Sequence, residues 1–500
     1  MPSAPSPAAV ASPSPAKAPS ALRRLRFPAT ARLERLGLAL VGFAALAGFL
    51  VFPTYPNYDS YYSLLWGREL VGLDPLSFTA YRAPTEHPLA IAFGALLTPF
   101  GDGADRVMVA CAVLSFLLLV VGVYVLAKTA FTPLVGAVAA ALLITRFDYP
   151  FLAARGYIDI PYLAVIIWAA VVETRAPRRH PMRVLVLLAA AGLMRPEAWL
   201  LTGLYWLYLL PSTSWKQRAT YAVLAAVGPL VWAAIDLAVT GNPLYSLTAT
   251  SELAEELGRN KGVAAVPEAL YAFLVKLAKF PVVLGAAIGL VLAIVLTPRR
   301  ALMPLALLLA GTGTFALVGF AGLSVIDRYL LVPSLCVMIF AAVFVAGWTM
   351  LEEGSRWRRI WAALASALVV FGIVFTATRV NLTQLYNELR FRGDSHTALE
   401  HVLHASAVAP ALRCGPLYVP NHKLIPDVRW ILDRSRSGVL ARSSEKVGEP
   451  RSGVVLLVHD RMAIFKQALV TDTDKTVDNL PPAGFTRAAT SEYYAAYVHC

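Results

Sequence analysis

Long apolar runs recur along most of this sequence and are separated by short polar connectors. A helix needs about 20 apolar residues to cross the hydrocarbon core of a bilayer. Since 58% of the residues are hydrophobic and only 15% are charged, a soluble domain could not hide this much apolar surface. The sequence therefore predicts a polytopic α-helical membrane protein with about eleven transmembrane helices. These helices are expected at residues 36–52, 105–127, 130–145, 158–173, 184–195, 197–210, 219–239, 281–297, 301–323, 329–350 and 360–378.

Two of these segments, 184–195 and 197–210, are short for a membrane crossing. Pro196 lies between them, and proline removes a backbone donor from the helical hydrogen-bond ladder. We expect two tilted helices that meet at Arg195-Pro196-Glu197. The break places two charged side chains inside an otherwise apolar region.

The distribution of basic residues predicts the orientation in the membrane. The chain has a net charge of +13, and its basic residues cluster in alternate connectors, which is the positive-inside pattern. These connectors and the N-terminus are expected to be cytoplasmic, and an odd number of spans then places the C-terminal region outside. No aromatic-interleaved basic stripe indicates a nucleic-acid groove, so we expect a lipid bilayer as partner, and no nucleic acid. The basic clusters lie at 23–35, 128, 175–183, 216–218, 299–300 and 356–359.

The two ends of the chain differ from its apolar middle. Residues 1–30 are rich in Pro, Ala and Ser and predict a disordered cytoplasmic tail. Residues 31–380 form the expected transmembrane domain. Residues 381–500 predict a small extracytoplasmic α/β domain. Its helix is expected at 394–407 and its strands at 417–419, 454–458 and 495–498.

The four cysteines fall into two groups. Cys111 and Cys336 lie inside apolar segments and are expected to be small core residues. Cys414 and Cys500 both belong to the C-terminal domain. They could form a disulfide if that domain is extracytoplasmic, or they could be two unrelated thiols. No CxxC motif or Cys/His cluster indicates a metal site.

The connector 53–104 carries the most information about function. Ordinary connectors are a few residues long, whereas this outer loop has about fifty residues. Its second half, 88–100, is apolar but too short to span a bilayer. We therefore expect short helices along the outer membrane surface, with aromatic side chains at the interface. These aromatic residues are Tyr58, Tyr61, Tyr62, Trp66 and Tyr81.

Asp59 follows the first expected span by only a few residues and lies at the outer membrane boundary. An acceptor hydroxyl could meet a lipid-borne donor there. Partial desolvation would raise the basicity of the carboxylate, as a general base requires. Alternatively, Asp59 or Ser60 could simply cap a helix that begins at Tyr61.

Further charged residues lie within or at the ends of the apolar segments. Such residues are costly in lipid and usually face a cavity or one another. Arg155, Arg195 and Arg328 all fall on the outer side and could bind the phosphate of a lipid carrier, because guanidinium matches phosphate oxygens in a fork. Mutual pairing, for example of Arg195 with Glu197 or Asp159, is the structural alternative. The charged residues are Arg155, Asp159, Arg195, Glu197, Asp236 (for which pairing is favoured) and Asp327-Arg328-Tyr329.

The order of these features resembles the GT-C glycosyltransferases, and within them the protein O-mannosyltransferase and aminoarabinose-transferase branch. A first span is followed by an Asp in an aromatic outer loop, a charged-Pro-Leu element, and a Phe-Gly-x-x-x-x-Arg entry into the second span. The resemblance covers roughly residues 36–380. The matching elements are Asp59, Glu86-His87-Pro88-Leu89, Phe100-Gly101 with Arg106, Arg155 with Asp159, Arg195-Pro196-Glu197, and Arg328-Tyr329.

The resemblance implies an inverting transfer of a sugar from a polyprenyl-phosphate donor to a glycan, lipid or protein acceptor on the outer face. Asp59 would be the general base or position the acceptor, and the arginines would hold the donor phosphate. The branch usually shows Asp-Glu at the first acidic site, whereas Ser60 follows Asp59 here. We therefore expect no metal and no other cofactor. The expected substrate-binding residues are Tyr62, Glu86, His87, Arg106, Arg155, Asp159, Arg195, Glu197, Arg328 and Tyr329.

Two other classes of function remain open. A lipid or glycan transporter or flippase would usually show internal repeats and broken helices at the midplane, and we find no clear repeat. A non-catalytic envelope-assembly protein would use its C-terminal domain to bind a partner. No GxGxxG or Walker loop indicates a soluble nucleotide donor.

Overall fold

The computed structural model describes residues 28–52, 54–256, 258, 262–323, 325–379, 382–469 and 480–500. Residues 1–27 of the expected disordered tail 1–30 lie outside this part. Contacts divide the chain into two compact units, Met1–Leu46 and Ala47–Cys500. The described part of the first unit belongs to helix α1 (Pro28–Val51), which carries the first apolar segment.

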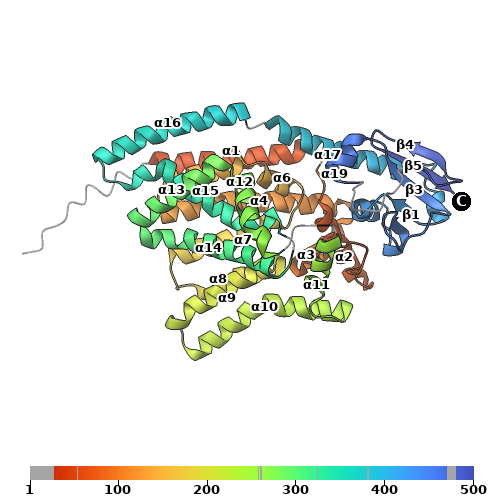
Figure 1. Ribbon diagram of the computed structural model, residues 1–500, viewed down its shortest axis with the longest axis horizontal. Coiled ribbons are helices and arrows are strands. Elements are labelled where there is room, and N and C mark those ends of the chain that lie inside the picture. The colour runs from red at the N-terminus through yellow and green to blue at the C-terminus, as the bar shows by residue number, and fades with distance from the viewer. Residues whose placement is uncertain are drawn as a thin grey trace, which may run out of the picture. The chain divides into compact units, whose positions relative to one another are not determined.

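The second unit is mainly helical (Figure 1). The expected apolar segments all overlap helices. The helices that follow α1 and precede the C-terminal domain are α2 (Tyr58–Gly72), α3 (Pro88–Leu97), α4 (Ala104–Ala130), α5 (Pro133–Ile144), α6 (Asp148–Ala154), α7 (Asp159–Arg175), α8 (Pro181–Met194), α9 (Glu197–Leu209), α10 (Trp215–Thr240), α11 (Tyr245–Glu256), α12 (Val266–Ala278), α13 (Phe280–Leu296), α14 (Pro298–Phe320), α15 (Leu331–Ala346) and α16 (Arg356–Arg379).

Length and composition identify the helices that can cross a membrane. Among the described residues, six helices qualify, or up to eight if each of two bent helix pairs forms one span. The chain is thus a multi-pass membrane protein, although the expected number of eleven spans is not established. The shortfall comes from α7, α8 and α9, which have 17, 14 and 13 residues and are shorter than the roughly 20 residues that a perpendicular crossing needs.

The expected break at Pro196 separates α8 from α9. Proline has no backbone N–H, so the carbonyl of Gly192, four residues earlier, lacks its helical donor. The indole Nε1 atoms of Trp199 and Trp232 donate to this carbonyl instead, over 2.9 and 3.1 Å. Side chains thus satisfy the polar group that the break exposes, which an apolar environment requires.

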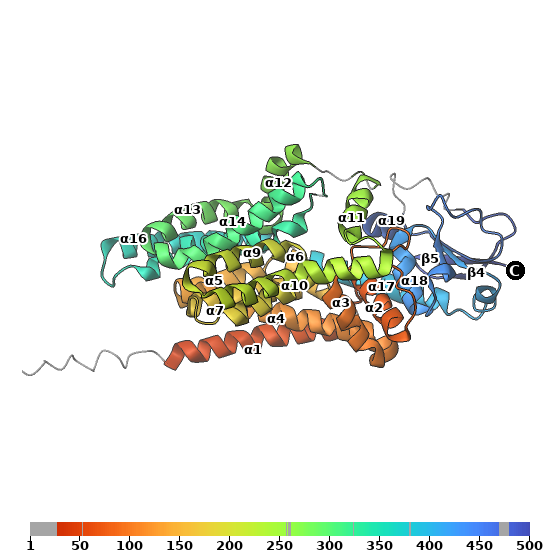
Figure 2. The ribbon, with the colours of Figure 1, turned by 90° about the horizontal axis from the view of Figure 1, so that it is seen from below.

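The outer segment after α1 folds into two helices whose backbones touch. A Cβ atom on Gly67 of α2 would lie 2.4 Å from the backbone of Ala95, and one on Gly94 of α3 would lie 2.4 Å from the carbonyl oxygen of Ser63. Only glycine permits this approach. In Figures 1 and 2, α2 and α3 lie at the end of the helical bundle that faces the C-terminal strands.

The elements of the C-terminal domain are α17 (Leu382–Leu403), β1 (Leu417–Val419), α18 (Ile425–Ile431), β2 (Val439–Ala441), β3 (Gly453–Val458), α19 (Arg461–Gln467), β4 (Thr486–Thr490) and β5 (Tyr494–His499). The strands form a five-stranded mixed sheet with the order β2-β1-β3-β5-β4. Strand β1 pairs in parallel with both β2 and β3, and β5 pairs antiparallel with both β3 and β4. The expected strands correspond to β1, β3 and β5, and the expected helix overlaps the second half of α17.

A disulfide between Cys414 and Cys500 joins the start of this domain's sheet to the end of the chain. Cys111 and Cys336 are free, and Cys336 is buried. Of the two possibilities that the sequence left open, the structure has the disulfide.

Buried charge attaches the C-terminal domain to the outer segment. Arg429 of α18 pairs with Glu69 of α2 over 2.8 Å, and its side chain is almost fully buried. Arg68 pairs with Asp433 over 3.1 Å and lies 3.4 Å from the ring centre of Trp430. Removing one partner of the Arg429–Glu69 pair would leave an uncompensated buried charge, so this pair holds the sheet domain firmly against α2. Asp433 is exposed, and its pair with Arg68 contributes less.

Candidate active site

Asp59 lies in the first turn of α2 but does not cap the helix. Asn57 is the cap, and its side chain accepts from the backbone N–H of Asp59 and of Ser60 over 2.8 and 3.4 Å. The backbone N–H of Asn57 donates to the carbonyl of Arg155, and the Ser60 hydroxyl donates to the carbonyl of Gly156. The Asp59 carboxylate is thereby free of the capping role and is fixed beside the α6–α7 connection.

The carboxylate of Asp59 belongs to a continuous chain of ion pairs. Nη1 of Arg328 lies 3.2 Å from Asp59 and 3.4 Å from Asp159. Asp159 also pairs with Arg195, and Arg195 pairs with Glu197 over 2.6 Å. These five residues are called the ion-pair chain below.

Exposure changes along the ion-pair chain. The side chain of Asp159 is fully buried, and those of Arg195 and Glu197 are less than one tenth exposed. Arg328 and Asp59, in contrast, are 31% and 22% exposed. A substrate can therefore reach the Asp59–Arg328 end, while the Asp159–Arg195–Glu197 end forms a buried support.

Tyrosine rings flank the two arginines of the ion-pair chain. The Arg328 guanidinium lies 5.6 Å from the ring centre of Tyr157. The Arg195 guanidinium lies 5.7 Å from that of Tyr162 and 5.5 Å from that of Tyr329. These distances allow cation–π attraction, which is stronger away from water. Tyr329 is thus a direct neighbour of the ion-pair chain, through its contact with Arg195.

Arg155 lies next to the Asp59 turn but outside the ion-pair chain. Its guanidinium stacks 4.1 Å from the ring centre of Tyr55 and donates to the carbonyl of Pro56 over 3.3 Å. Within the described residues, its buried Nε and Nη1 atoms have no hydrogen-bond partner. Unused guanidinium donors of this kind fit an anionic ligand.

His87 precedes α3 and packs edge-on against Trp232, with ring centres 5.8 Å apart. Burial, together with the positive charge of Arg195, lowers the pKa of His87 to about 4. The imidazole is therefore neutral at physiological pH. Its buried Nδ1 makes no hydrogen bond to the part of the chain that the structure describes.

Two other expected substrate-binding residues have different partners. The Arg106 guanidinium donates to the carbonyls of Thr54 and Phe49 over 2.7 and 2.8 Å, which ties α4 to the segment before α2. Tyr62 is fully buried, and its ring packs 5.2 Å from that of Trp66. The structure does not bring either residue into the ion-pair chain.

Glu86 belongs to a separate buried acidic cluster. The Ser246 hydroxyl lies 2.9 Å from Glu86 and 2.7 Å from Asp236. Burial raises the pKa of Glu86 to about 7, and the nearby charge of Asp236 adds to this shift. Asp236, for which an ion pair was expected, has none among the described residues and accepts from Ser246 instead. This cluster joins the outer loop to α10 and α11.

Three residues that contact the expected site residues were not themselves expected, namely Asn57, Tyr157 and Ser246. Asn57 directly precedes the Tyr58-Asp59 pair, so a capping signal was present in the sequence, whereas Tyr157 and Ser246 carry no local signal. Among the described residues, no group of three or more His, Cys, Asp or Glu side chains is arranged to hold a metal ion.

Comparison with solved structures adds an independent observation. The chain is similar to ArnT from Cupriavidus metallidurans bound to undecaprenyl phosphate, with 14% sequence identity, a TM-score of 0.53, and coverage of 92% of this chain and 97% of that chain. The chain has the GT-C fold. An oligosaccharyltransferase from Archaeoglobus fulgidus, crystallised with a tethered acceptor peptide, is also similar, with 12% identity, a TM-score of 0.46, and coverage of 81% and 63%. No family model and no curated protein matches the sequence.

The GT-C likeness extends over 92% of this chain and 97% of the ArnT chain. The fold expected from the order of sequence motifs is therefore confirmed. At this level of identity the likeness concerns the fold, and the chemistry has to be argued from the side chains.

Proposed function

We propose that the chain is a membrane glycosyltransferase that transfers a hexose or pentose from a polyprenyl-phosphate donor to an acceptor on the extracytoplasmic face. The observation that carries this proposal is the accessible Asp59–Arg328 pair, in which a carboxylate and a guanidinium meet beside the outer segment. A sugar transfer of this kind needs a base for the acceptor and a positive charge for the leaving phosphate. Support also comes from the fold, since the ArnT structure with the same fold holds undecaprenyl phosphate.

In the proposed step, the acceptor hydroxyl loses its proton to the Asp59 carboxylate while its oxygen bonds to the anomeric carbon. The bond between that carbon and the phosphate oxygen breaks, and polyprenyl phosphate leaves with the electron pair. Attack from the side opposite the phosphate inverts the anomeric configuration. Phosphate is a good leaving group, so positioning and charge compensation are the main demands on the protein.

Arg328 is the arginine best suited to the donor phosphate, because it is the accessible one in the ion-pair chain. It also pairs with Asp59 over 3.2 Å, so a donor phosphate would compete with Asp59 for the guanidinium.

The other two arginines near Asp59 have different proposed roles. Arg195 is saturated by Asp159 and Glu197, so its proposed role is to fix Asp159, which in turn fixes Arg328. Arg155 has unused donors and is proposed as a second phosphate contact. His87, Glu86, Tyr62, Arg106 and Tyr329 remain predicted substrate-site residues.

The disulfide supports the proposed sidedness. Disulfides persist in oxidising compartments outside the cytosol, and the Cys414–Cys500 bond lies in the C-terminal domain. That domain contacts α2 through Arg429 and Glu69, so the Asp59 segment belongs on the same side. The N-terminus is proposed to be cytoplasmic, in accord with the basic connectors.

The deciding experiment compares Asp59→Asn with Asp74→Asn, a matched change at an exposed carboxylate of the same outer loop. Membranes that contain equal amounts of each variant are assayed for sugar transfer from radiolabelled polyprenyl-phosphate sugars. We expect a loss of about 100-fold or more for D59N and activity near that of the unmodified protein for D74N. Full activity of D59N would remove Asp59 from the mechanism, and donor translocation without transfer would support a flippase instead.

A further inference from the structure

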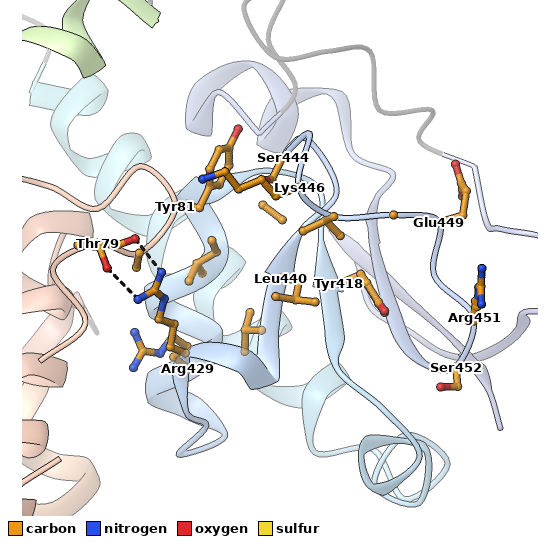
Figure 3. A pocket seen from close by; sticks show the side chains of 17 residues that line it. Thr79, Tyr81, Tyr418, Arg429, Leu440, Ser444, Lys446, Glu449, Arg451 and Ser452 are labelled. Carbon is orange, nitrogen blue, oxygen red and sulfur yellow. Dashed lines mark hydrogen bonds between the residues drawn. The ribbon is translucent and has the colours of Figure 1, made fainter. Parts of the chain in front are cut away.

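A cavity of about 470 Å³ lies in the C-terminal domain, between edge strand β2 and the outer-loop residues 79–81. In Figure 3, Tyr418 and Leu440 lie at its centre, Lys446 lies near Tyr81 on one side, and Arg451 lies on the other. Its volume falls within the roughly 300–1,000 Å³ of small-molecule sites. The described residues that line it include no member of the ion-pair chain.

The accessible charge of this cavity, called the sheet pocket below, is positive. Lys446 and Arg451 are exposed and make no ion pair within the described residues. Arg436 donates to the side chain and the carbonyl of Thr79 over 2.9 and 2.8 Å, which leaves its charge uncompensated at the rim. Among the described residues that line the cavity, Glu449 is the one acidic residue. The sheet pocket therefore favours an anionic ligand.

The fourth basic lining residue plays a structural role. Arg429 is buried and neutralised by Glu69 over 2.8 Å, and its Nη1 also donates to Ser77. It is therefore not available to a ligand, and it fixes the wall of the sheet pocket to α2.

Aromatic and hydroxyl groups accompany the positive charge. The rings of Tyr81 and Tyr418 and the side chains of Ser444 and Ser452 line the same cavity. Sugar rings present C–H faces, which suit the electron-rich faces of aromatic rings, and hydroxyl edges, which pair with polar side chains. This combination fits a carbohydrate with charged substituents better than a purely apolar ligand.

The wall of the sheet pocket is connected directly to the turn that carries the proposed base. The Tyr81 hydroxyl donates to the carbonyl of Ser443 in the C-terminal domain over 3.4 Å. The hydroxyl of Tyr58, the neighbour of Asp59, donates to the carbonyl of Arg82 over 2.7 Å. The His422 ring contacts both tyrosines edge-on, at 5.7 Å from Tyr58 and 6.3 Å from Tyr81.

We propose that the sheet pocket binds an acidic oligosaccharide. This oligosaccharide is one part of the acceptor, and it stays bound in the sheet pocket while another part of the acceptor reaches Asp59. The assignment as acceptor rests on the proposed function, whereas the binding itself does not. Lys446 and Arg451 supply the charge-assisted contacts to carboxylate or phosphate groups, and the two tyrosines supply the ring contacts.

The test is a binding measurement with the full-length protein in detergent micelles. The probe is fluorescently labelled tetragalacturonate, and the comparison probes are its neutral methyl ester and tetraglutamate. We expect tetragalacturonate to bind about tenfold or more tightly than either. The double variant Lys446→Gln/Arg451→Gln should lose about tenfold in affinity for tetragalacturonate and almost none for the ester.

The matched control is Arg413→Gln/Arg461→Gln, which removes the same charge from exposed positions of the domain outside the sheet pocket. Equal losses in both double variants, or equal binding of tetraglutamate, would show unspecific attraction by net charge and overturn the proposal. Absence of tetragalacturonate binding would also overturn it. Asp59→Asn should bind like the unmodified protein, so a failed transfer assay with intact binding would reject the catalytic proposal and leave the sheet pocket as a glycan site.

Discussion

Nη1 of Arg328 donates to Oδ2 of Asp59 over 3.2 Å, although 269 residues separate the two in the sequence. Arg328 belongs to a short 3-10 turn, Asp327–Leu330, that leads into α15, and Asp59 belongs to the first turn of α2. The pair thus joins the outer segment to the far half of the helical bundle. A ligand that takes Arg328 away from Asp59 would break this contact between the two parts of the fold.

Changes at Arg328 should affect donor use in a graded manner. Arg328→Lys keeps the positive charge but loses the planar fork, and we expect about tenfold slower transfer. Arg328→Ala removes the charge as well, with an expected loss of about 100- to 1,000-fold and a higher KM for the polyprenyl-phosphate donor. Transfer rates as a function of donor concentration measure both effects. Arg390→Ala, at an exposed ion pair on α17, should have no effect.

Arg195 should matter for stability more than for donor affinity. Replacing it with Met leaves the buried Glu197 without an ion-pair partner and Asp159 with Arg328 alone, and breaking a buried pair costs about 3–5 kcal/mol. Thermal unfolding of the purified variant in detergent measures this cost. The double variant Arg195→Met/Asp159→Asn should recover part of the lost stability. Unchanged stability of Arg195→Met would contradict the role of a buried support.

Glu86 should make stability depend on pH. Its pKa is about 7 in the folded chain, above the ordinary value of 4.5, because of burial. The folded state thus binds the proton more tightly than the unfolded state, and the contribution of Glu86 is fully present below pH 4.5 and lost as the pH rises through 7.

Glu86→Gln mimics the protonated form and should remove this decline. Its melting temperature should match that of the unmodified protein near pH 5 and exceed it near pH 8. Glu268→Gln, at an exposed position of α12, should follow the unmodified protein at every pH. Parallel curves for Glu86→Gln and the unmodified protein would contradict this prediction.

Loss of the disulfide should destabilise the C-terminal domain. Cys414 and Cys500 are 86 residues apart, and closing a loop of this size restricts the unfolded chain by about 4 kcal/mol. Cys414→Ser/Cys500→Ser should therefore be cleaved faster by an added protease within residues 381–500. Cys111→Ser, at a free thiol, should show the normal pattern. An unchanged cleavage rate in the double variant would argue against a stabilising bond.

The features that the sequence predicted are those with a local cause. Apolar runs produced helices because burial in lipid depends on composition, and Pro196 ended α8 because it lacks a donor. Strand β3 was recognisable as a continuous apolar run of six residues, whereas β4 is largely exposed and has no clear pattern. Strands β1 and β2 have three residues each, and of these two only β1 was predicted. The GT-C fold could be expected because the order of its motifs follows the chain.

The partners of the charged residues could not be predicted in the same way. Arg106 and Arg328 both lie near apolar segments, but one binds backbone carbonyls and the other binds Asp59. Their difference depends on how distant helices pack, and no local pattern records that. Pairing of Arg195 with Glu197 or Asp159 was one of the two alternatives that the sequence left open, and the structure has both pairs.

The contact between Gly67 and Gly94 limits how the outer segment can diversify during evolution. Any side chain at either position would push α2 and α3 apart, since a Cβ atom would lie 2.4 Å from the opposing backbone. Asp59 and Glu69 are both on α2, so the displacement would disturb the carboxylate and the attachment of the sheet domain together. A saturation library should therefore return almost only glycine at these two positions, whereas the exposed Val71 near the end of the same helix should accept many residues.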